Sequence, residues 1–456
     1  MTTLVWLRDD LRTDDHPALA AAASDPGGVV ALYVLDESSD GVRPLGGAAK
    51  WWLHHSLVSL AASLAALGVP LVLRRGPAAE VVPLVVAETG ASRVLWNRRY
   101  GSAERRIDAE LKQALRAAGL EAHSFPGSLL FEPWTVATKQ GGPFRVYSPF
   151  WRACLAAPAP RTPLPVPDFA DPPATAASVP TDAFETWQLR PQAPDWAAEF
   201  GARWQPGEPA ARARLREFLA QRAHRYARER DLPASDATSG LAPHLRFGEI
   251  SPQRVWHEAL VSGADVGMFL SELGWREFAW HTYFHRPELA TRNLDDRFDA
   301  FPWRDDTGEA LERWRRGTTG IPLVDAGMRE LWRTGSMHNR VRMVVASFLT
   351  KNLLVDWREG EAWFWDTLVD ADQASNPFNW QWVAGCGADA APYFRIFNPV
   401  TQQQKFDPDG AYVDRWAPDA VLTPPMVDLK ETRVRALAAF EQMKGSAHAS
   451  RPELSA

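Results

Sequence analysis

Residues 336–399 read SMHNRVRMVVASFLTKNLLVDWREGEAWFWDTLVDADQASNPFNWQWVAGCGADAAPYFRIFNP, and their charged side chains stand among apolar ones. Arg340 and Arg342 lead into an apolar run, and this pattern predicts a buried helix. A buried arginine needs a carboxylate partner, because an isolated charge in a protein core costs several kcal/mol. Asp370 or Asp372 can supply that carboxylate. A structural ion pair in a helical core is one interpretation, but the polar and aromatic groups that follow favour a binding site.

Six short motifs in this segment match the flavin-binding core of the DNA photolyase/cryptochrome family in identity and spacing. They are Met337-His338-Asn339-Arg340, Asp356-Trp357-Arg358-Glu359-Gly360, Asp370-Ala371-Asp372, Asn376, Trp380-Gln381-Trp382 and Ala391-Pro392-Tyr393-Phe394-Arg395. The segment resembles in particular the bacterial cyclobutane pyrimidine dimer (CPD) photolyases of the branch near plant cryptochromes (class III-like). Weaker similarity extends over nearly the whole chain.

The composition is that of a soluble globular protein. The 456 residues are enough for two or three domains, and 46% of them are hydrophobic and 23% charged. A net charge of −6 argues against a non-specific nucleic-acid binder, which usually carries a strongly basic balance. Any DNA site must therefore be a local basic patch. The 21 tryptophans exceed ordinary usage and favour roles in stacking or electron transfer.

Cysteine and histidine patterns argue against disulfides and metals. The only cysteines, Cys154 and Cys386, imply no disulfide framework, favour a cytoplasmic location and exclude an iron–sulfur cluster held by four thiolates. His281 and His285 are four residues apart on a predicted helix, but no H-E-x-x-H pattern or cysteine cluster supplies further zinc ligands. We therefore expect no metal. With no signal peptide and no apolar run of about 20 residues, we expect no membrane association.

The N-terminal part, residues 1–130, alternates strand-like and helix-like patterns. Predicted strands lie at 4–7, 29–35, 71–73 and 94–96, and predicted helices at 51–67 and 102–118. This alternation implies a doubly wound parallel sheet covered on both faces. No G-x-G-x-x-G fingerprint follows the first strand, so a dinucleotide site is not indicated. The resemblance implies that this Rossmann-like domain carries a light-harvesting antenna.

Three further segments follow along the chain. Alternating prolines predict an extended interdomain connector at 131–209. Residues 210–440 read as helix and loop, and the resemblance implies an all-helical, FAD-binding catalytic domain. Small and polar residues at 441–456 predict a frayed tail. The expected fold class is therefore α/β plus all-α.

Arginine is concentrated at 211–231. The seven arginines are Arg212, Arg214, Arg216, Arg222, Arg225, Arg228 and Arg230. A solvated helix face with pairs to Glu217 and Glu229 explains them about as well as a phosphate-facing patch. The resemblance implies that Tyr226 contacts the flavin and that Arg230 lies at the DNA-facing rim.

A hydroxyl-bearing loop comprises Thr238, Ser239, Gly240 and Leu241. Hydroxyls and backbone N–H groups where a loop enters a helix can bind an anion, and a simple helix N-cap is the alternative. The resemblance implies that this loop holds the FAD diphosphate. Ala242 stands where many relatives carry another hydroxyl.

The resemblance assigns further flavin contacts to the helical domain. Arg342, paired with Asp370, would lie beside the isoalloxazine ring and favour the reduced, anionic form of FAD. Asp372 would accept hydrogen bonds from the ring or the ribityl chain. Asn376 would place a neutral amide at flavin N5, where plant-type cryptochromes typically have an aspartate, and so favours a repair enzyme. The expected catalytic set is Glu272, Asn339, Arg342, Asp370 and Asn376, and Glu272 and Asn339 would also contact the cofactor.

Glu272 and Trp275 are three residues apart and therefore share a helix face. An indole that stacks and a carboxyl group that hydrogen-bonds a pyrimidine edge suit a pocket for a flipped-out base. The resemblance assigns the lesion pocket to Glu272, Trp275, Asn339, Met343 and Trp382, and the DNA strand to Arg230, Arg276, Arg340 and Gln402. Phe269 and Ser336 stand where tryptophans are common in the family.

The resemblance implies blue-light-driven repair of CPDs by a deoxyribodipyrimidine photo-lyase. An electron would pass from reduced FAD to the flipped-out lesion and return after the cyclobutane bonds split. Trp380, Trp357 and Trp303 match the family's electron-transfer chain from flavin to surface, although each alone is more often a core residue. The histidine pair expected of a (6-4) photolyase is absent at Met337-His338-Asn339.

The sequence leaves the identity of the antenna chromophore open. Trp51-Trp52-Leu53-His54-His55-Ser56-Leu57 and Trp96-Asn97-Arg98-Arg99-Tyr100 resemble the branch nearest plant cryptochromes, which tends to carry a folate. A folate, methenyltetrahydrofolate, is therefore favoured over 8-hydroxydeazaflavin, and Glu104 matches a folate-contacting glutamate. Ala103 and Arg43 do not match its usual partners, so a deazaflavin or an empty site remains an alternative.

Two other functions are alternatives, a cryptochrome-like photoreceptor without repair activity and a (6-4) photolyase. Asn376, the lesion-pocket residues and the lack of a long C-terminal extension argue against the photoreceptor. We expect a monomer that acts on UV-damaged DNA.

Overall fold

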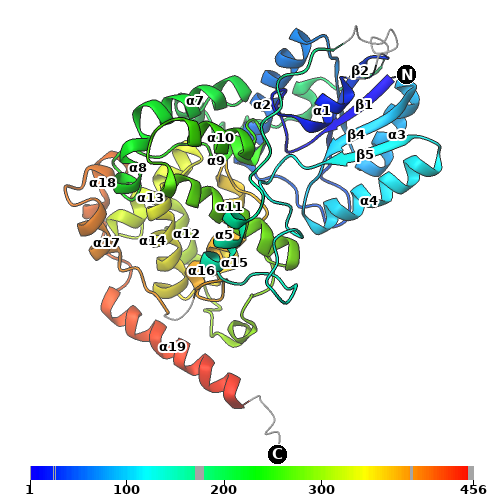
Figure 1. The fold of residues 1–456 in the computed structure, drawn as a ribbon. Helices are drawn as coiled ribbons and strands as arrows, with labels where there is room; N and C mark the ends of the chain where they lie inside the picture. Colours follow the sequence, from blue (N-terminus) through cyan, green and yellow to red (C-terminus); the bar gives the residue numbers. More distant parts are fainter. Residues whose placement is uncertain (1, 24, 26, 170–178, 391–393, 450–456) are drawn as a thin grey trace, which may run out of the picture. The chain divides into compact units, whose positions relative to one another are not determined.

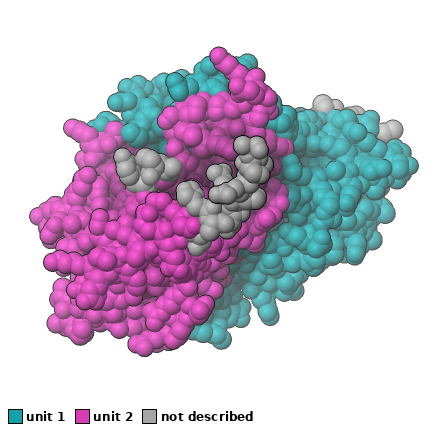
Figure 2. All heavy atoms as spheres, turned by 90° about the horizontal axis from the view of Figure 1, so that it is seen from below, with its two compact units in different colours: residues 1–137, 151–224, 238–277 teal, residues 138–150, 225–237, 278–456 magenta. Residues whose placement is uncertain are grey.

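The structure, a computed structural model, describes residues 2–23, 25, 27–169, 179–390 and 394–449, without the side chains of 446–449. The chain divides into two compact units, which Figure 2 colours separately. Unit 1 comprises residues 1–137, 151–224 and 238–277, and unit 2 comprises residues 138–150, 225–237 and 278–456. Neither unit is one continuous stretch of chain.

A five-stranded, fully parallel sheet forms the N-terminal part of unit 1 (Figure 1). The strands are β1 (Thr2–Leu7), β2 (Val29–Leu35), β3 (Leu71–Arg75), β4 (Ala91–Asn97) and β5 (Glu121–Phe125), in the order β3-β2-β1-β4-β5. In register, Val5 lies opposite Ala31 of β2 and Leu95 of β4. Every residue of β1 and β2 is buried, as expected for central parallel strands covered on both faces. The predicted doubly wound sheet is confirmed.

Helices cover this sheet. Leu4, Trp6 and Val30 share one hydrophobic cluster with side chains of α3 (Ala78–Thr89) and α4 (Ser102–Ala117). Because side chains alternate along a strand, Val5 and Leu7 point to the opposite face. Two further helices contact the strands: α1 (Pro17–Ala22) contacts β1 and β4, and α2 (Gly47–Ala66) contacts β3. The switch in strand order between β1 and β4 is where ligands of such sheets usually bind.

The described residues after β5 form helices and loops, as predicted for 210–440. After β5 come α5 (Tyr147–Ala156), η2 (Phe184–Trp187), α6 (Phe200–Arg203), α7 (Glu208–Gln221), α8 (Ala223–Glu229), α9 (Ala242–Arg246), α10 (Pro252–Val261) and α11 (Gly267–His285). Unit 2 continues with η3 (Asp296–Ala300), α12 (Gly308–Arg316), α13 (Pro322–Thr334), α14 (Asn339–Ser347), η4 (Phe348–Asn352), α15 (Trp357–Thr367), α16 (Ser375–Ala384), α17 (Pro399–Phe406), α18 (Ala411–Trp416), η5 (Ala420–Leu422) and α19 (Leu429–Ala449).

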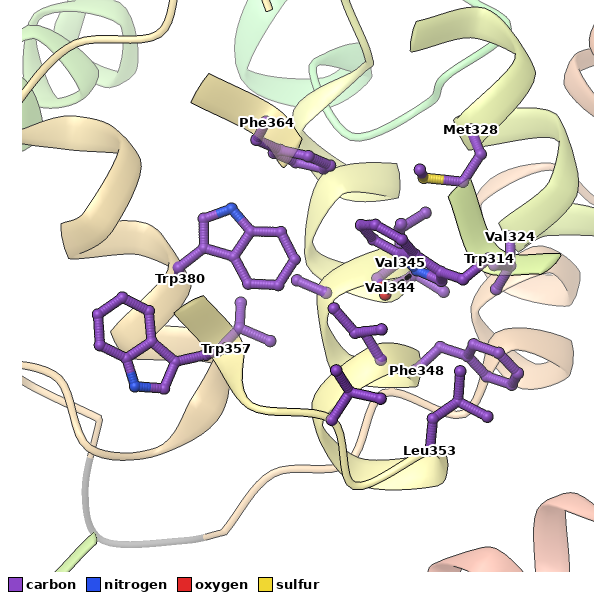
Figure 3. Packing of buried hydrophobic residues seen from close by; sticks show 14 of the residues in the cluster. Trp314, Val324, Met328, Val344, Val345, Phe348, Leu353, Trp357, Phe364 and Trp380 are labelled. Carbon is purple, nitrogen blue, oxygen red and sulfur yellow. Dashed lines mark hydrogen bonds between the residues drawn. The ribbon is translucent and has the colours of Figure 1, made fainter. Parts of the chain in front are cut away.

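The buried helix predicted from the apolar run is confirmed as α14, which continues into the π-helical turn η4. Val344, Val345, Phe348 and Leu349 have no exposed surface and belong to the hydrophobic core of unit 2, and Figure 3 labels the first three. A π-helical turn is rare and is often found at functional sites. Here it ends the helix, because Leu353 N donates to Phe348 O at 3.0 Å.

Two local predictions need correction. The stretch 211–231 forms two helices, because α7 ends at Gln221 and its C-cap residue Arg222 has a non-helical φ of −125° before α8 begins. The connector 131–209 includes the helix α5, whose Phe150 and Cys154 are buried, so apolar burial overrides the irregular pattern there.

The predicted fraying from residue 441 is wrong for 441–449, and residues 450–456 lie outside the described part. Helix α19 continues to Ala449. Alanines favour helix, and the buried side chain of Met443 fixes this segment in the unit 2 core. In the part of the chain that the structure describes, no helix is long and apolar enough to cross a membrane.

Gly248 provides a test of close packing in unit 1. Its φ is +65°, and a Cβ there would stand 2.1 Å from the Asp9 carbonyl oxygen. Gly119 also has a positive φ, +82°, but has no atom within 4 Å of its Cβ position. We expect Gly248→Ala to lower the free energy of unfolding by about 2–4 kcal/mol and Gly119→Ala by about 1 kcal/mol. The free energy of unfolding of both variants is measured by urea unfolding. Equal losses in the two variants would show that the close contact with Asp9 does not matter at Gly248.

Candidate active site

Arg342 and Asp370 form the ion pair that the family resemblance implied. Arg342 Nη2 donates to Asp370 Oδ2 at 2.9 Å, and Arg342 Nε donates to the Met337 carbonyl oxygen at 2.7 Å. The side chains are 25% and 10% exposed. The other oxygen, Asp370 Oδ1, is buried and has no hydrogen-bond partner among the described residues. A buried acceptor in this state marks a place where a ligand donor fits.

Asp372 orders the start of α16. Its Oδ1 accepts hydrogen bonds from the backbone N–H groups of Ala374, at 2.9 Å, and Ser375. Asn376 follows in the first turn of that helix. The predicted contact between Asp372 and the flavin stays a prediction.

The Asn376 amide is held in one orientation. Its Nδ2 donates to the carbonyl oxygen of Glu361 at 3.0 Å and to Glu361 Oε1 at 2.8 Å. Both partners can only accept, so the NH₂ group must face them and Oδ1 must point elsewhere. Glu361 is 3% exposed and was not predicted from the sequence. In the sequence it is indistinguishable from a solvated glutamate on a helix.

The turn that leads into α14 is fixed from two sides. His338 Nδ1 accepts from Arg340 N at 3.2 Å and caps the helix just before Asn339. The His338 N–H donates to Glu330 Oε2 at 3.2 Å, and Tyr412 Oη donates to the same oxygen at 2.6 Å. Burial lowers the pKa of His338 to about 4, so the ring is neutral at pH 7. Glu330 and Tyr412 were also missed, because their contacts are distant in sequence.

The other residues predicted in unit 2 lie on several helices. Arg230 stands over the Tyr226 ring at 5.5 Å. Met343 and Trp382 are partly buried and pack against the hydrophobic core. Gln402 lies on α17 and is partly buried. Their predicted contacts with flavin or DNA stay predictions.

Trp380 and Trp357 belong to the buried hydrophobic cluster of unit 2, and Trp303 packs against that cluster (Figure 3 labels the first two). Trp380 is 2% exposed, Trp357 is fully buried and Trp303 is partly buried. Trp357 Nε1 donates to Asn293 Oδ1 at 2.9 Å. A Cβ on Gly360 would stand 2.1 Å from the Trp380 ring, so α15 and α16 pack closely there. This placement is compatible with electron transfer and equally with core packing.

The hydroxyl-bearing loop lies in unit 1. Ser239 Oγ accepts from Leu241 N at 3.3 Å. Gly240 has φ +64°, and a Cβ there would stand 2.6 Å from Arg214 Nη1. Glycine thus lets a guanidinium group approach a loop that carries Thr238 and Ser239. A cation beside hydroxyls and backbone N–H groups suits a diphosphate.

Glu272, Trp275 and Arg276 lie on α11 and are all partly exposed within unit 1. A Cβ on Gly274 would stand 2.7 Å from the Trp151 ring, so α11 packs closely on α5 here.

Packing accommodates the residues that depart from the family pattern. Phe269 packs against Phe218 with ring centroids 4.7 Å apart. In unit 2, Ser336 is buried, and its N–H donates to Thr334 Oγ1 at 3.2 Å. Residues 391–393 of the Ala391–Arg395 motif lie outside the described residues.

The predicted antenna residue Glu104 is 4% exposed on α4. Its charge helps to raise the pKa of Arg99, although burial opposes this. Directly after β1, Arg8 Nη2 donates to Asp108 Oδ2 of α4 at 3.1 Å. None of these contacts identifies a chromophore.

His281 packs among aromatic side chains in unit 2. It accepts a hydrogen bond from Phe144 N at 3.0 Å, and its ring lies 4.8 Å from that of His285. Within the described ranges, no group of three or more His, Cys, Asp or Glu side chains is placed to hold a metal ion.

Comparisons with known proteins agree with this arrangement. Residues 3–168 match the family model described as DNA photolyase, and residues 269–424 match the FAD binding domain of DNA photolyase. The chain is 51% identical to the deoxyribodipyrimidine photo-lyase of Agrobacterium fabrum over 425 residues, which are 91% of this chain and 87% of that protein. This chain belongs to the DNA photolyase family. The FAD-binding model also shows that its cofactor is FAD.

Two further relatives place the chain within the photolyase family. It is 38% identical to cryptochrome-1 of Arabidopsis thaliana over 91% of this chain and 63% of the cryptochrome. Its structure matches a crystal structure of a bacterial class III photolyase from Agrobacterium tumefaciens with a TM-score of 0.92 and 46% identity, covering 97% of this chain and 98% of that one. Within unit 2 the residues present fit FAD, because the buried Asp370 Oδ1 has no hydrogen-bond partner among the described residues and can accept a hydrogen bond from the cofactor.

Glu277 provides a pH test in unit 1. Burial raises its pKa to about 7, against the opposing effects of Arg276 and the N–H groups of Leu130 and Phe131. Protonation therefore favours the folded state, and this stabilisation is lost as the pH rises through about 7. We expect the free energy of unfolding to fall by up to about 3 kcal/mol between pH 5 and 8.

Glu277→Gln should remove this pH dependence, measured by urea unfolding across the same range. Glu110→Gln is the matched control, because Glu110 is an exposed glutamate of the same unit. Parallel pH profiles for the wild type and Glu277→Gln would show that Glu277 does not titrate in this way.

Proposed function

We propose that this protein repairs cyclobutane pyrimidine dimers in DNA with blue light. The observation that carries the proposal is the Asn376 amide, held by Glu361 at the start of α16, in the same core as the Arg342–Asp370 pair. The relatives named deoxyribodipyrimidine photo-lyase and class III photolyase support it.

Each residue has a defined task in this proposal. Bound FAD, in its reduced anionic form, would supply the light-driven electron that splits the cyclobutane ring. Arg342 would provide positive charge beside the reduced ring system, and Asp370 would hold the guanidinium group in place. Asn376 would present its amide oxygen without a titrating proton, because Glu361 holds its NH₂ group.

The substrate in this proposal is UV-damaged DNA with the lesion turned out of the duplex. Unstacking costs a few kcal/mol, and less where damage has already weakened pairing. Glu272, Trp275, Asn339, Met343 and Trp382 would receive the lesion, and Trp380, Trp357 and Trp303 would return electrons to oxidised flavin. The diphosphate of FAD would lie at the loop of Thr238, Ser239, Gly240 and Leu241.

We also propose a folate antenna and a monomeric, cytoplasmic protein. The folate is supported by the match of Glu104 and by the resemblance of residues 51–57 and 96–100 to the branch that tends to carry a folate. Extraction of the purified protein and chromatography of its chromophores would identify a folate or a deazaflavin.

The test is repair of an oligonucleotide that carries one cyclobutane dimer, by reduced FAD-loaded protein, in blue light and in darkness. A (6-4) oligonucleotide runs beside it. We expect light-dependent restoration of the cyclobutane dimer only. Protein with bound FAD that restores neither lesion would overturn the proposal and favour a photoreceptor, and restoration of the (6-4) lesion alone would reassign the substrate.

Asn376→Asp tests the role of the amide. An aspartate at this position would face the Glu361 carboxylate, which favours its protonated form and so places an exchangeable proton near the flavin. We expect the repair rate per bound flavin to fall by about tenfold, or about 1.4 kcal/mol.

Asn379→Asp is the matched control, because Asn379 is exposed on the same helix and its Nδ2 donates to Ser375 O. Flavin content is measured for both variants. A repair rate for Asn376→Asp equal to that of the control would contradict the assigned role.

A further inference from the structure

The guanidinium group of Arg340 is enclosed by two residues that the resemblance does not assign. Arg340 Nη2 donates to Asp231 Oδ2 at 2.6 Å, and the guanidinium carbon lies 4.4 Å from the centroid of the Phe406 ring. The Arg340 side chain is 18% exposed. Its Nε is buried and has no hydrogen-bond partner in the described parts of the chain. The charge is thus held between a carboxylate and an aromatic face within unit 2.

This enclosure selects one nitrogen for an external ligand. Asp231 occupies Nη2 and Nε is buried, so Nη1 is the nitrogen that remains for an acceptor outside the protein. Phe406 contacts the guanidinium group by a cation–π interaction, which is stronger when the cation is partly desolvated. An arginine side chain that is already ordered loses less conformational entropy when it binds.

The surroundings of Phe406 carry further donors. Lys405 Nζ lies 5.0 Å from the centroid of the same ring. Gln402 lies four residues before Phe406 on α17, so both share one face of that helix. Two cations at one ring, with an amide-bearing residue on the same helix face, suit a phosphate group, which accepts hydrogen bonds and carries negative charge.

We propose that Asp231 and Phe406 are positioning residues that hold Arg340 ready for a phosphate of the DNA strand. Phe406 sets the plane of the guanidinium group, and Asp231 sets its rotation. The proposal deepens the proposed function and rests on it. It assigns no chemical step to either residue, so they act on DNA affinity and leave the repair chemistry of bound substrate unchanged.

The test is equilibrium binding in darkness of FAD-loaded protein to a duplex with one cyclobutane dimer, over a range of salt concentrations. We expect Phe406→Leu to raise Kd by about 3–10-fold and Phe406→Tyr, which keeps the aromatic face, by less than about twofold. Asp231→Ala should also raise Kd, and Asp231→Asn, which keeps a hydrogen-bond acceptor, should restore most of the affinity. Arg340→Ala should weaken binding and lower the salt slope by about 1.

A double-mutant cycle separates positioning from a structural role. In the Arg340→Ala background we expect Phe406→Leu to have no further effect, because no guanidinium group is left to position. The matched control is Phe440→Leu, because Phe440 is a partly buried phenylalanine with Lys444 at 5.2 Å from its ring centroid. It should leave Kd unchanged. Unchanged binding by Phe406→Leu and Asp231→Ala, or equal losses with and without Arg340, would overturn the inference.

Light-driven repair by the wild type is measured on the same preparations. Wild-type repair with unaltered binding by the Phe406 and Asp231 variants would overturn this inference alone. A wild type that neither binds nor repairs the dimer duplex would overturn the proposed function and this inference together. Folding of Phe406→Leu is judged by flavin content and thermal unfolding. If this variant fails to fold, the Kd values of Asp231→Ala and Asp231→Asn test the positioning role instead.

Discussion

The ion pair between Arg342 and Asp370 is the constraint on which the helical core depends. Both charges are largely removed from water, with side chains 25% and 10% exposed, so either charge without its partner would destabilise the folded state. The chain must therefore hold Asp370 against α14 while it passes from α15 to α16. The backbone does so through Val369 N, which donates to the Gly335 carbonyl oxygen at 2.8 Å. The end of α13, the start of α14 and the carboxylate are thereby fixed together.

Hydrogen bonds also fix the polar groups next to this ion pair. Asp372 orders the start of α16, and Asn376 stands in the first turn of that helix with its NH₂ group held by Glu361. The next helical turn brings Trp380 against Gly360. A buried polar network of this kind is rigid when every member has a partner. Asp370 Oδ1, which has none among the described residues, is the exception and thus marks the ligand side.

Sequence patterns predicted the parts of the structure that rest on local or strongly periodic signals. The strand at 29–35 has the predicted bounds, and the apolar run after Arg342 forms a buried helix. A buried cation needs a nearby anion, which predicted a carboxylate partner but left Asp370 and Asp372 as alternatives; the pairing of Arg342 with Asp370 came from the family resemblance. The end of α19 was missed, because the burial of Met443 depends on packing that the local sequence does not show.

Local sequence patterns could not predict the carboxylates that hydrogen-bond to residues farther along the chain. Glu361, Glu330 and Asp231 look like solvated helix residues in the sequence. Their partners Asn376, His338 and Arg340 are 15, 8 and 109 residues away. Only the tertiary fold joins these groups, so their roles follow from geometry and not from spacing.

The most direct test of the central claim is the midpoint potential of bound FAD in the wild type and in Arg342→Gln, measured by spectroelectrochemical titration. A positive charge beside the cofactor stabilises its reduced anion, so its loss should shift the potential to more negative values. A potential that stays unchanged, or becomes more positive, in a variant that still binds FAD would contradict the account.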